Sequence, residues 1–201
     1  MTASCIEQFT RRFESLRGQT RVVPHALAAA QTVADICVAA EAAKVALALL
    51  DGELETEVET RCTERGIQVI RPPYAHAELP AALDTVNVGV TGAAFGIAQS
   101  GTLVEVCTDD SHRLVSALPR TYIGVVRASS LVNGFFDAAP RLREIFLSHE
   151  RGCTVSFISG PSRTGDIEMI LTLGVHGPEA AYAIVVDDIG SVGGEWRSGS
   201  E

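Results

Sequence analysis

The sequence predicts an α/β protein with a mostly parallel, Rossmann-like sheet that is covered by helices on both faces. Strand-like and helix-like segments alternate along nearly the whole chain, and this order builds parallel sheets. Hydrophobic residues make up 46% of the 201 residues and charged residues 20%, which is typical of a globular chain. Aromatic residues reach only 5%, so the core must consist mainly of Ala, Val, Leu and Ile, as in helix-covered parallel sheets.

The spacing of apolar residues places the elements in order. Helices are expected at 4–17, 26–40, 53–65, 77–83, 93–99, 111–118 and 129–149, with a break of the last helix at Pro140. Strands are expected at 45–50, 67–70, 86–90, 102–107, 122–126, 153–159 and 182–186. We expect a single domain over residues 1–189, with residues 1–40 as a helical extension packed on it and residues 190–201 as a flexible tail.

Charge and cysteine content exclude several classes of function. A net charge of −9 argues against binding to nucleic acid or to an anionic membrane through the overall charge of the protein. No apolar run reaches about 18 residues, so we expect no membrane span, and the N-terminus lacks the apolar stretch of a secretory signal. The five cysteines are odd in number and widely spaced, which indicates reduced thiols in a cytoplasmic protein. No two form a C-x-x-C pair, so we expect neither a metal site nor an iron–sulfur cluster in this chain.

The sharpest motif follows the strand expected at 153–159. Gly160 permits a turn or a close approach to a ligand that a Cβ atom would block. Ser162 and Thr164 add hydroxyl groups, and Arg163 offers a fork that matches a carboxylate or a phosphate. Ligands of parallel sheets bind beyond the carboxyl ends of strands, so the loops after Val90, Cys107 and Ser159 are the first places to look.

Two acidic residues complete this motif. Asp166 and Glu168 could bind a cation, accept hydrogen bonds or neutralise Arg163. The alternative is a turn that is held by its own side chains, in which Thr164 caps a short helix and Arg163 pairs with Asp166. Residue types alone leave both interpretations open.

A second motif is Gly174-Val175-His176-Gly177-Pro178. His176 could act as an acid or a base near neutral pH, although a histidine between apolar neighbours and a Gly-Pro turn is more often structural. Its closeness in sequence to the first motif favours a functional role.

A third candidate is the turn Ser100-Gly101-Thr102, whose small residues could let backbone N–H groups face a ligand. It is equally compatible with a simple turn into a strand. Arg113 lies near a helix start, where a cation opposes the helix dipole. It could therefore reach something anionic, or it could pair with Asp109 or Asp110.

Five stretches together resemble the LUD domain family, and within it the small-subunit type called lactate utilisation protein C: residues 98–103, 113–114, 118–119, 158–168 and 174–178. Order and spacing agree over roughly residues 85–187, and Ser100 stands where the family usually has Thr. The resemblance implies a fold like the NagB/RpiA/CoA-transferase group. It also implies a role in oxidising lactate to pyruvate alongside two iron–sulfur proteins, which carry the cysteine motifs that this chain lacks.

These observations give three hypotheses. In the first, the chain is a subunit of a lactate-oxidising system that binds a small carboxylate such as lactate, Arg163 pairs the carboxylate, and Asp166, Glu168 or His176 handles protons. The ligand-binding residues would be Ser100, Gly101, Thr102, Arg113, Gly160, Ser162, Arg163, Thr164 and Gly177. In the second, the same surface binds the iron–sulfur partners without catalysis. The third is a CoA-transferase-like or isomerase-like enzyme acting on a small acid, and for a CoA-transferase the nucleophile would be Glu105 or Glu168. A homo-oligomer is compatible with all three.

Overall fold

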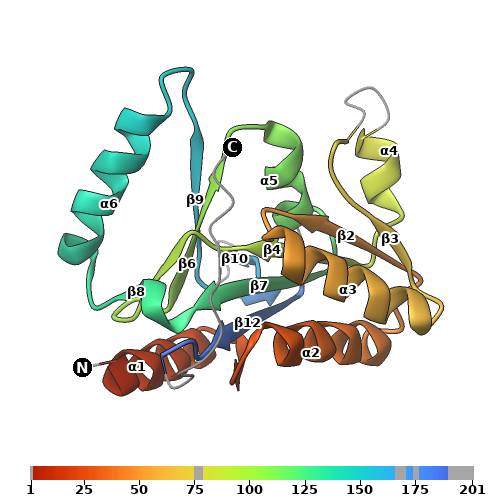
Figure 1. Ribbon diagram of the computed structural model, residues 1–201, viewed down its shortest axis with the longest axis horizontal. Helices are drawn as coiled ribbons and strands as arrows, with labels where there is room; N and C mark the ends of the chain where they lie inside the picture. Colours follow the sequence, from red (N-terminus) through yellow and green to blue (C-terminus); the bar gives the residue numbers. More distant parts are fainter. Residues whose placement is uncertain (1, 75–78, 166–170, 174–176, 190–201) are drawn as a thin grey trace.

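The computed structural model describes residues 2–74, 79–165, 171–173 and 177–189. Its centre is a six-stranded sheet in which every described pair of neighbours is parallel, with the order β1-β12-β7-β4-β2-β3 (Figure 1). The strands are β1 (Gln19–Val23), β2 (Lys44–Ala48), β3 (Gln68–Ile70), β4 (Val88–Gly92), β7 (Thr121–Arg127) and β12 (Ala180–Val186). The predicted Rossmann-like class is therefore confirmed.

Helices cover both faces of this sheet (Figure 1). On one face, α2 (Ala26–Ala39) and α3 (Gly52–Glu64) bury alternate strand residues such as Val45, Leu47 and Ile123. On the other face lie α1 (Thr2–Ser15), α4 (Leu79–Asp84) and α5 (Asp110–Ala117). This alternation follows from the two-residue period of a strand, and burial on both sides explains why the inner strands β2, β4, β7 and β12 are rich in apolar residues.

A smaller sheet stands beside the first one, with the order β8-β5-β6-β9. Its strands are β5 (Phe95–Ile97), β6 (Thr102–Cys107), β8 (Leu131–Val132) and β9 (Thr154–Ile158). A 3-10 turn, η1 (Ala128–Ser130), precedes β8, and α6 (Phe135–Ser148) packs on the outer face of this sheet. A short antiparallel hairpin, β10 (Arg163–Gly165) and β11 (Leu171–Leu173), follows β9.

Several element predictions were wrong. Residues 93–99 were expected to be a helix, but they contain β5, which pairs with β6 and β8. The helix expected from residue 129 starts only at Phe135, and it continues through Pro140. The N–H group that Pro140 lacks would have bonded the Phe136 carbonyl in the exposed first turn, where water can take its place. Thr164, which one interpretation placed at the cap of a short helix, lies in strand β10, and residues 166–170 are outside the described residues.

Strand β1 of the larger sheet lacked a prediction altogether. Gln19–Val23 forms β1, an edge strand that pairs with β12 in parallel. Three of its five residues are exposed to solvent, and only Thr20 and Val23 are buried. Such a strand has only a weak apolar signal in the sequence.

None of the helices in the described part of the chain is long and apolar enough to cross a membrane.

Candidate functional site

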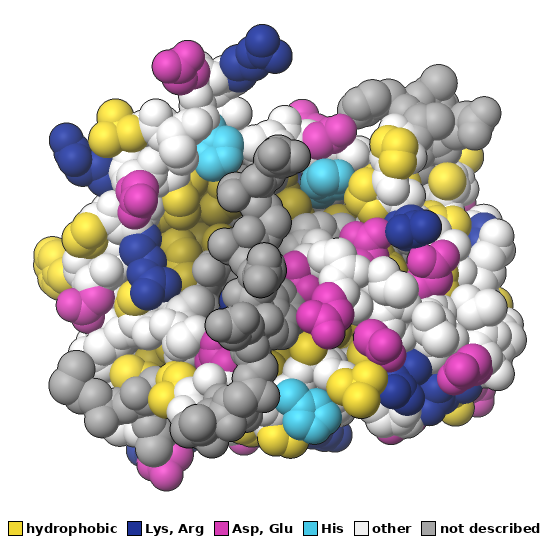
Figure 2. All heavy atoms as spheres, viewed as in Figure 1, with side chains coloured by type: hydrophobic (Ala, Val, Ile, Leu, Met, Phe, Trp, Pro, Cys, Tyr) yellow, Lys and Arg dark blue, Asp and Glu magenta, His cyan; other side chains and the backbone are white. Residues whose placement is uncertain are grey.

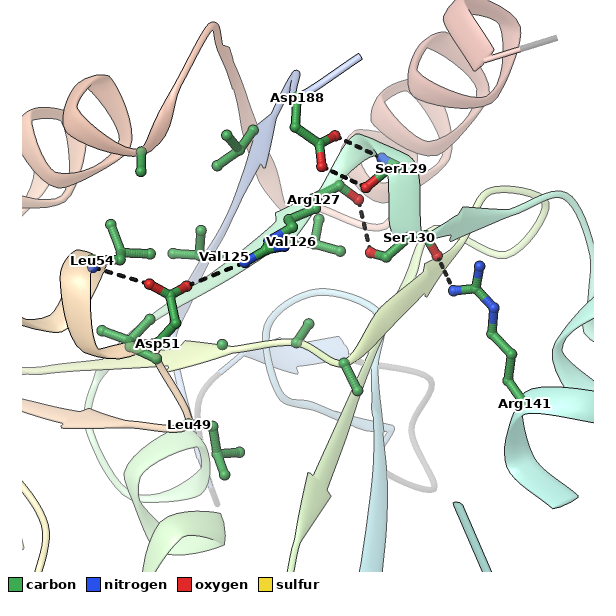
Figure 3. A pocket seen from close by; sticks show the side chains of 16 residues that line it. Leu49, Asp51, Leu54, Val125, Val126, Arg127, Ser129, Ser130, Arg141 and Asp188 are labelled. Carbon is green, nitrogen blue, oxygen red and sulfur yellow. Dashed lines mark hydrogen bonds and ion pairs between the residues drawn. The ribbon is translucent and has the colours of Figure 1, made fainter. Parts of the chain in front are cut away.

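A crevice of about 560 Å³ opens at the carboxyl edge of the parallel sheet (Figure 3). The ends of β4, β7 and β12 and the residues that follow β2, β4, β7 and β12 form its walls, and α2, α3 and α6 contribute one residue each. In open α/β sheets this edge is the usual place for a ligand, and the volume lies in the range of small-molecule sites. The lining residues are Ala26, Leu49, Leu50, Asp51, Leu54, Gly92, Ala93, Ala94, Val125, Val126, Arg127, Ser129, Ser130, Arg141, Val186 and Asp188.

The two carboxylates of the crevice are bound to the protein itself. Asp51 caps helix α3, because its Oδ1 accepts a hydrogen bond of 3.1 Å from the Leu54 N–H. Asp188 accepts hydrogen bonds from both the backbone N–H and the hydroxyl of Ser129. These bonds fix the carboxylates as parts of the wall and hold η1 against the end of β12.

The two guanidinium groups of the crevice come from β7 and α6. Arg127 Nη2 lies 3.8 Å from Asp51 Oδ2, and both side chains are partly exposed (Figure 3). A long, half-exposed ion pair of this kind contributes little to stability. Arg141 reaches over from α6, donates one hydrogen bond of 2.7 Å from Nη1 to the Ser130 carbonyl, and lies above the Phe95 ring at 5.7 Å. Among the described residues, the hydrogen bonds of Arg141 use only this one donor nitrogen.

A buried polar cluster lies on the face of the sheet opposite α2 and α3, where β6 passes over β4 and β7. Glu105 is fully buried, and its Oε1 accepts hydrogen bonds from Thr91 and from the Tyr122 hydroxyl, the latter at 2.9 Å. Its Oε2 has no partner among the described residues. Burial raises the pKa of Glu105 and outweighs the hydrogen bonds, and burial raises the pKa of Tyr122 well above its ordinary value.

This burial bears on the CoA-transferase hypothesis. A nucleophilic carboxylate must reach the carbonyl carbon of a thioester. Glu105 has no exposed surface and binds two hydroxyl groups instead. The structure therefore gives Glu105 an internal role, and Glu168 lies outside the described residues.

The predicted turns come together through their described residues. Thr102 Oγ1 lies 2.6 Å from Ser100 Oγ and 2.7 Å from Ser159 Oγ, so three hydroxyl groups form a chain from one turn to the other. The Ser162 N–H donates a hydrogen bond of 2.8 Å to the Pro178 carbonyl. We call the set Ser100, Thr102, Ser159, Ser162 and Gly177 the turn cluster.

Two glycines let helix α1 approach this cluster. Gly101 has φ +61°, and a Cβ atom there would lie 2.5 Å from the backbone nitrogen of Phe13. Gly160 has φ +117°, and its Cβ would lie 2.8 Å from the Leu16 carbonyl oxygen. Both positions combine a left-handed backbone with close contact to α1 or to Leu16 just after it, which only glycine allows without strain. In this structure the two glycines therefore serve packing, and their predicted role in ligand binding is untested.

Ser162 and Gly177 of the turn cluster lie at the opposite edge of the parallel sheet from the crevice. Gly177 lies close to the Ala117 carbonyl, just before the first residues of β7 and β12, whereas the crevice follows their last residues. Seven residues of β7 separate the two edges, which at about 3.3 Å per residue is roughly 20 Å. A single small ligand cannot touch both Gly177 and the crevice.

The remaining predicted residues are less informative. Arg113 Nε lies 3.5 Å from Asp110 Oδ1, which is the ion pair that the alternative interpretation named. Its predicted role in ligand binding remains a prediction. Asp166, Glu168 and His176 lie outside the described residues, and Arg163 and Thr164 are described only as part of strand β10.

The crevice residues Arg127, Ser129, Arg141 and Asp188 were missed by the sequence analysis. A signal for the first two was present, since a charged residue and two serines follow the strand expected at 122–126. The sequence held no such signal for Arg141, because only the tertiary fold brings α6 beside the end of β7.

The geometry defines a class: a Rossmann-like α/β protein with a polar crevice at the carboxyl edge of its sheet. The LUD domain family matches residues 6–186, so the chain belongs to the LUD domain family.

Similar proteins agree with this assignment. Lactate utilization protein C of Shouchella clausii is 41% identical over 105 residues, which cover 52% of this chain and 46% of that protein. Lactate utilization protein C of Bacillus subtilis is 42% identical over 109 residues, covering 52% and 44%. The matched region thus spans about half the length of these curated relatives. The crystal structure of a DUF162 family protein from Deinococcus radiodurans superimposes with a TM-score of 0.59 at 26% identity, over 92% of this chain and 98% of that one.

Proposed function

We propose that this chain serves lactate utilisation by binding a small carboxylate such as lactate in the crevice at the carboxyl edge. The names of the curated relatives support the pathway. The observation that carries the binding site is the pair of guanidinium groups, Arg127 and Arg141, beside the Ser129 and Ser130 hydroxyls. In a chain with a net charge of −9, an anion needs such local cations to bind.

Arg141 is the main anchor of the proposed site. Its Nη1 is fixed by the Ser130 carbonyl and its side chain rests on Phe95, so little conformational freedom is lost when a ligand binds. The nitrogens left over form one side of a planar fork, which matches a carboxylate. Arg127 adds a second positive charge to the wall of the crevice.

Oxidation of lactate to pyruvate removes one hydrogen from C2 and one from the hydroxyl group, which amounts to two electrons and two protons. We propose that Arg141 and Arg127 would hold the carboxylate, and that iron–sulfur partner proteins would supply the acceptor for the two electrons. The crevice is much larger than lactate, which leaves room for a group of the partner to approach C2.

Isothermal titration of the protein with lactate tests the binding step. Arg141→Met keeps the apolar part of the side chain over Phe95 but removes every donor, so lactate affinity should fall about tenfold or more. Arg143→Met is the matched control, because Arg143 is exposed on the same helix and does not line the crevice. An unchanged affinity in Arg141→Met would reject the site.

The turn cluster is the second candidate for the ligand site. The observation that favours it is the hydroxyl chain Ser100–Thr102–Ser159, which runs up to the Arg163 motif. In this version Arg163 pairs the carboxylate, and Asp166, Glu168 or His176 handles protons. A stably folded Arg163→Ala variant separates the two sites: loss of lactate binding and of growth on lactate would favour the turn cluster, and unchanged values would favour the crevice.

A further inference from the structure

Helix α6 and strand β9 expose an unusual number of large apolar side chains. Five of the ten large hydrophobic side chains that are exposed in the described part of the chain lie between residues 135 and 157. Their exposed fractions are 58% for Phe135, 94% for Phe136, 57% for Phe146, 65% for Leu147 and 47% for Phe157. We call these five residues the α6–β9 face. Figure 2 shows hydrophobic side chains gathered in the hollow beside α6.

The four members of this face that lie on α6 differ from the residues through which the helix packs on the protein. The inner side is formed by Ala138, Leu142 and Ile145, which contact the core of the smaller sheet. Phe135 and Phe146 are 11 residues apart, as are Phe136 and Leu147, so each pair returns to one side of the helix after three turns. The helix therefore carries apolar residues well beyond the stripe that its own fold buries.

The helix and the strand contribute to one continuous surface. The rings of Phe135 on α6 and Phe157 on β9 have centroids 6.2 Å apart. With about 200 Å² for a fully exposed phenylalanine, the five exposed fractions represent roughly 600 Å² on each chain. Two such faces would bury about 1,200 Å², which is the lower bound of a stable protein–protein interface.

The charges around the face are balanced. Residues 135–157 contain three arginines and three carboxylates: Arg141, Arg143, Arg151, Asp137, Glu144 and Glu150. The net charge of −9 therefore arises entirely elsewhere in the chain. Two copies of an acidic protein repel each other over most surfaces, but at this neutral face they can meet, and a two-fold axis pairs opposite charges equally on both sides.

We propose that the α6–β9 face binds the same face of a second copy of this chain, so that the protein forms a two-fold symmetric dimer. The apolar area of the face and its lack of net charge both fit a second copy of the chain. A basic partner would require a net negative face, and this face carries no net charge. Because apolar burial drives the contact while the overall charge opposes it, added salt should tighten the dimer.

Sedimentation equilibrium over a wide range of protein concentration tests the proposal. The wild type should dimerise, and Phe136→Asp should raise the dimer dissociation constant about 30-fold or more, as expected for a central aromatic residue. Val38→Asp is the matched control, since Val38 is an exposed hydrophobic residue on α2 and should leave the dimer unchanged. Circular dichroism checks that both variants fold.

Three results would overturn the proposal: a wild type that stays monomeric at every concentration, a dimer that Phe136→Asp leaves intact, and a dimer that salt weakens. A monomer that binds an iron–sulfur partner through Phe136 would assign the face to that partner instead. The test is independent of lactate binding, since none of the five residues lines the crevice.

Discussion

Replacement of Glu105 by leucine should destabilise the protein, because the buried cluster loses its acceptor. Thr91 and Tyr122 both donate to the carboxyl group, and their own oxygens lie 3.2 Å apart. One hydroxyl can still donate to the other, so one buried donor is left without a partner. Such a donor costs about 1–3 kcal/mol. For a chain of this size, a loss of about 2 kcal/mol lowers Tm by about 4–8 °C.

Glu105→Gln separates charge from hydrogen bonding. Burial raises the pKa of Glu105 above its ordinary value of 4.5, so the folded protein keeps a proton that the unfolded chain releases. The free energy of unfolding therefore falls as pH rises from the ordinary pKa through the raised one. Glutamine resembles the protonated acid and does not titrate, so Glu105→Gln should lose this pH dependence and gain stability relative to the wild type as pH rises.

Urea denaturation followed by circular dichroism at several pH values measures both effects. Glu64→Gln is the control for a generic change of charge, since Glu64 is exposed on α3. The reasoning is refuted if Glu105→Leu is as stable as the wild type, or if Glu105→Gln loses stability relative to the wild type as pH rises. The second result would mean that the folded state prefers the charged carboxylate.

Two further predictions concern the glycines and the thiols. Gly152→Ala should lower the free energy of unfolding by about 1 kcal/mol, because Gly152 has φ +86° but open space around its Cβ position. Gly101→Ala should lower it by about 1–3 kcal/mol more, because the added Cβ atom would overlap with Phe13. Equal losses in thermal unfolding would contradict the packing argument. Burial raises the pKa of the Cys107 thiol to about 11, so an alkylating reagent at neutral pH should modify the partly exposed Cys153 and leave Cys107 untouched until the protein unfolds. Mass spectrometry of the labelled chain measures which thiols are modified. Modification of Cys107 in the folded protein would contradict this prediction.

The inner strands of the parallel sheet were predictable because they are buried on both faces. Runs such as Val45–Leu50 and Tyr122–Val126 are continuously apolar, and turn residues bound them on both sides. The second sheet was harder. Residues 93–99 are small and suggested a helix, but Phe95 and Ile97 are buried in a three-residue strand that depends on pairing with β6 and β8. Pairing of this kind is a tertiary effect that local sequence does not reveal.

The two candidate sites differ in how far they could be predicted from the sequence. The turn cluster was predicted from adjacent polar residues and glycines, and the hydrogen bond between Thr102 and Ser159 joins residues that are far apart in sequence. The crevice depends on the spatial order of β2, β4, β7 and β12. That order places Asp51, Arg127 and Asp188 around one opening although 137 positions separate the first from the last.

The most direct test of the account is hydrogen–deuterium exchange of the protein with and without lactate. If lactate binds in the crevice, slower exchange should appear in the segments around residues 92–94 and 127–130, and it should be absent in Arg141→Met. Slower exchange confined to residues 100–102 and 159–162 would contradict the crevice and assign the ligand to the turn cluster, and no change anywhere would reject lactate as the ligand of this chain.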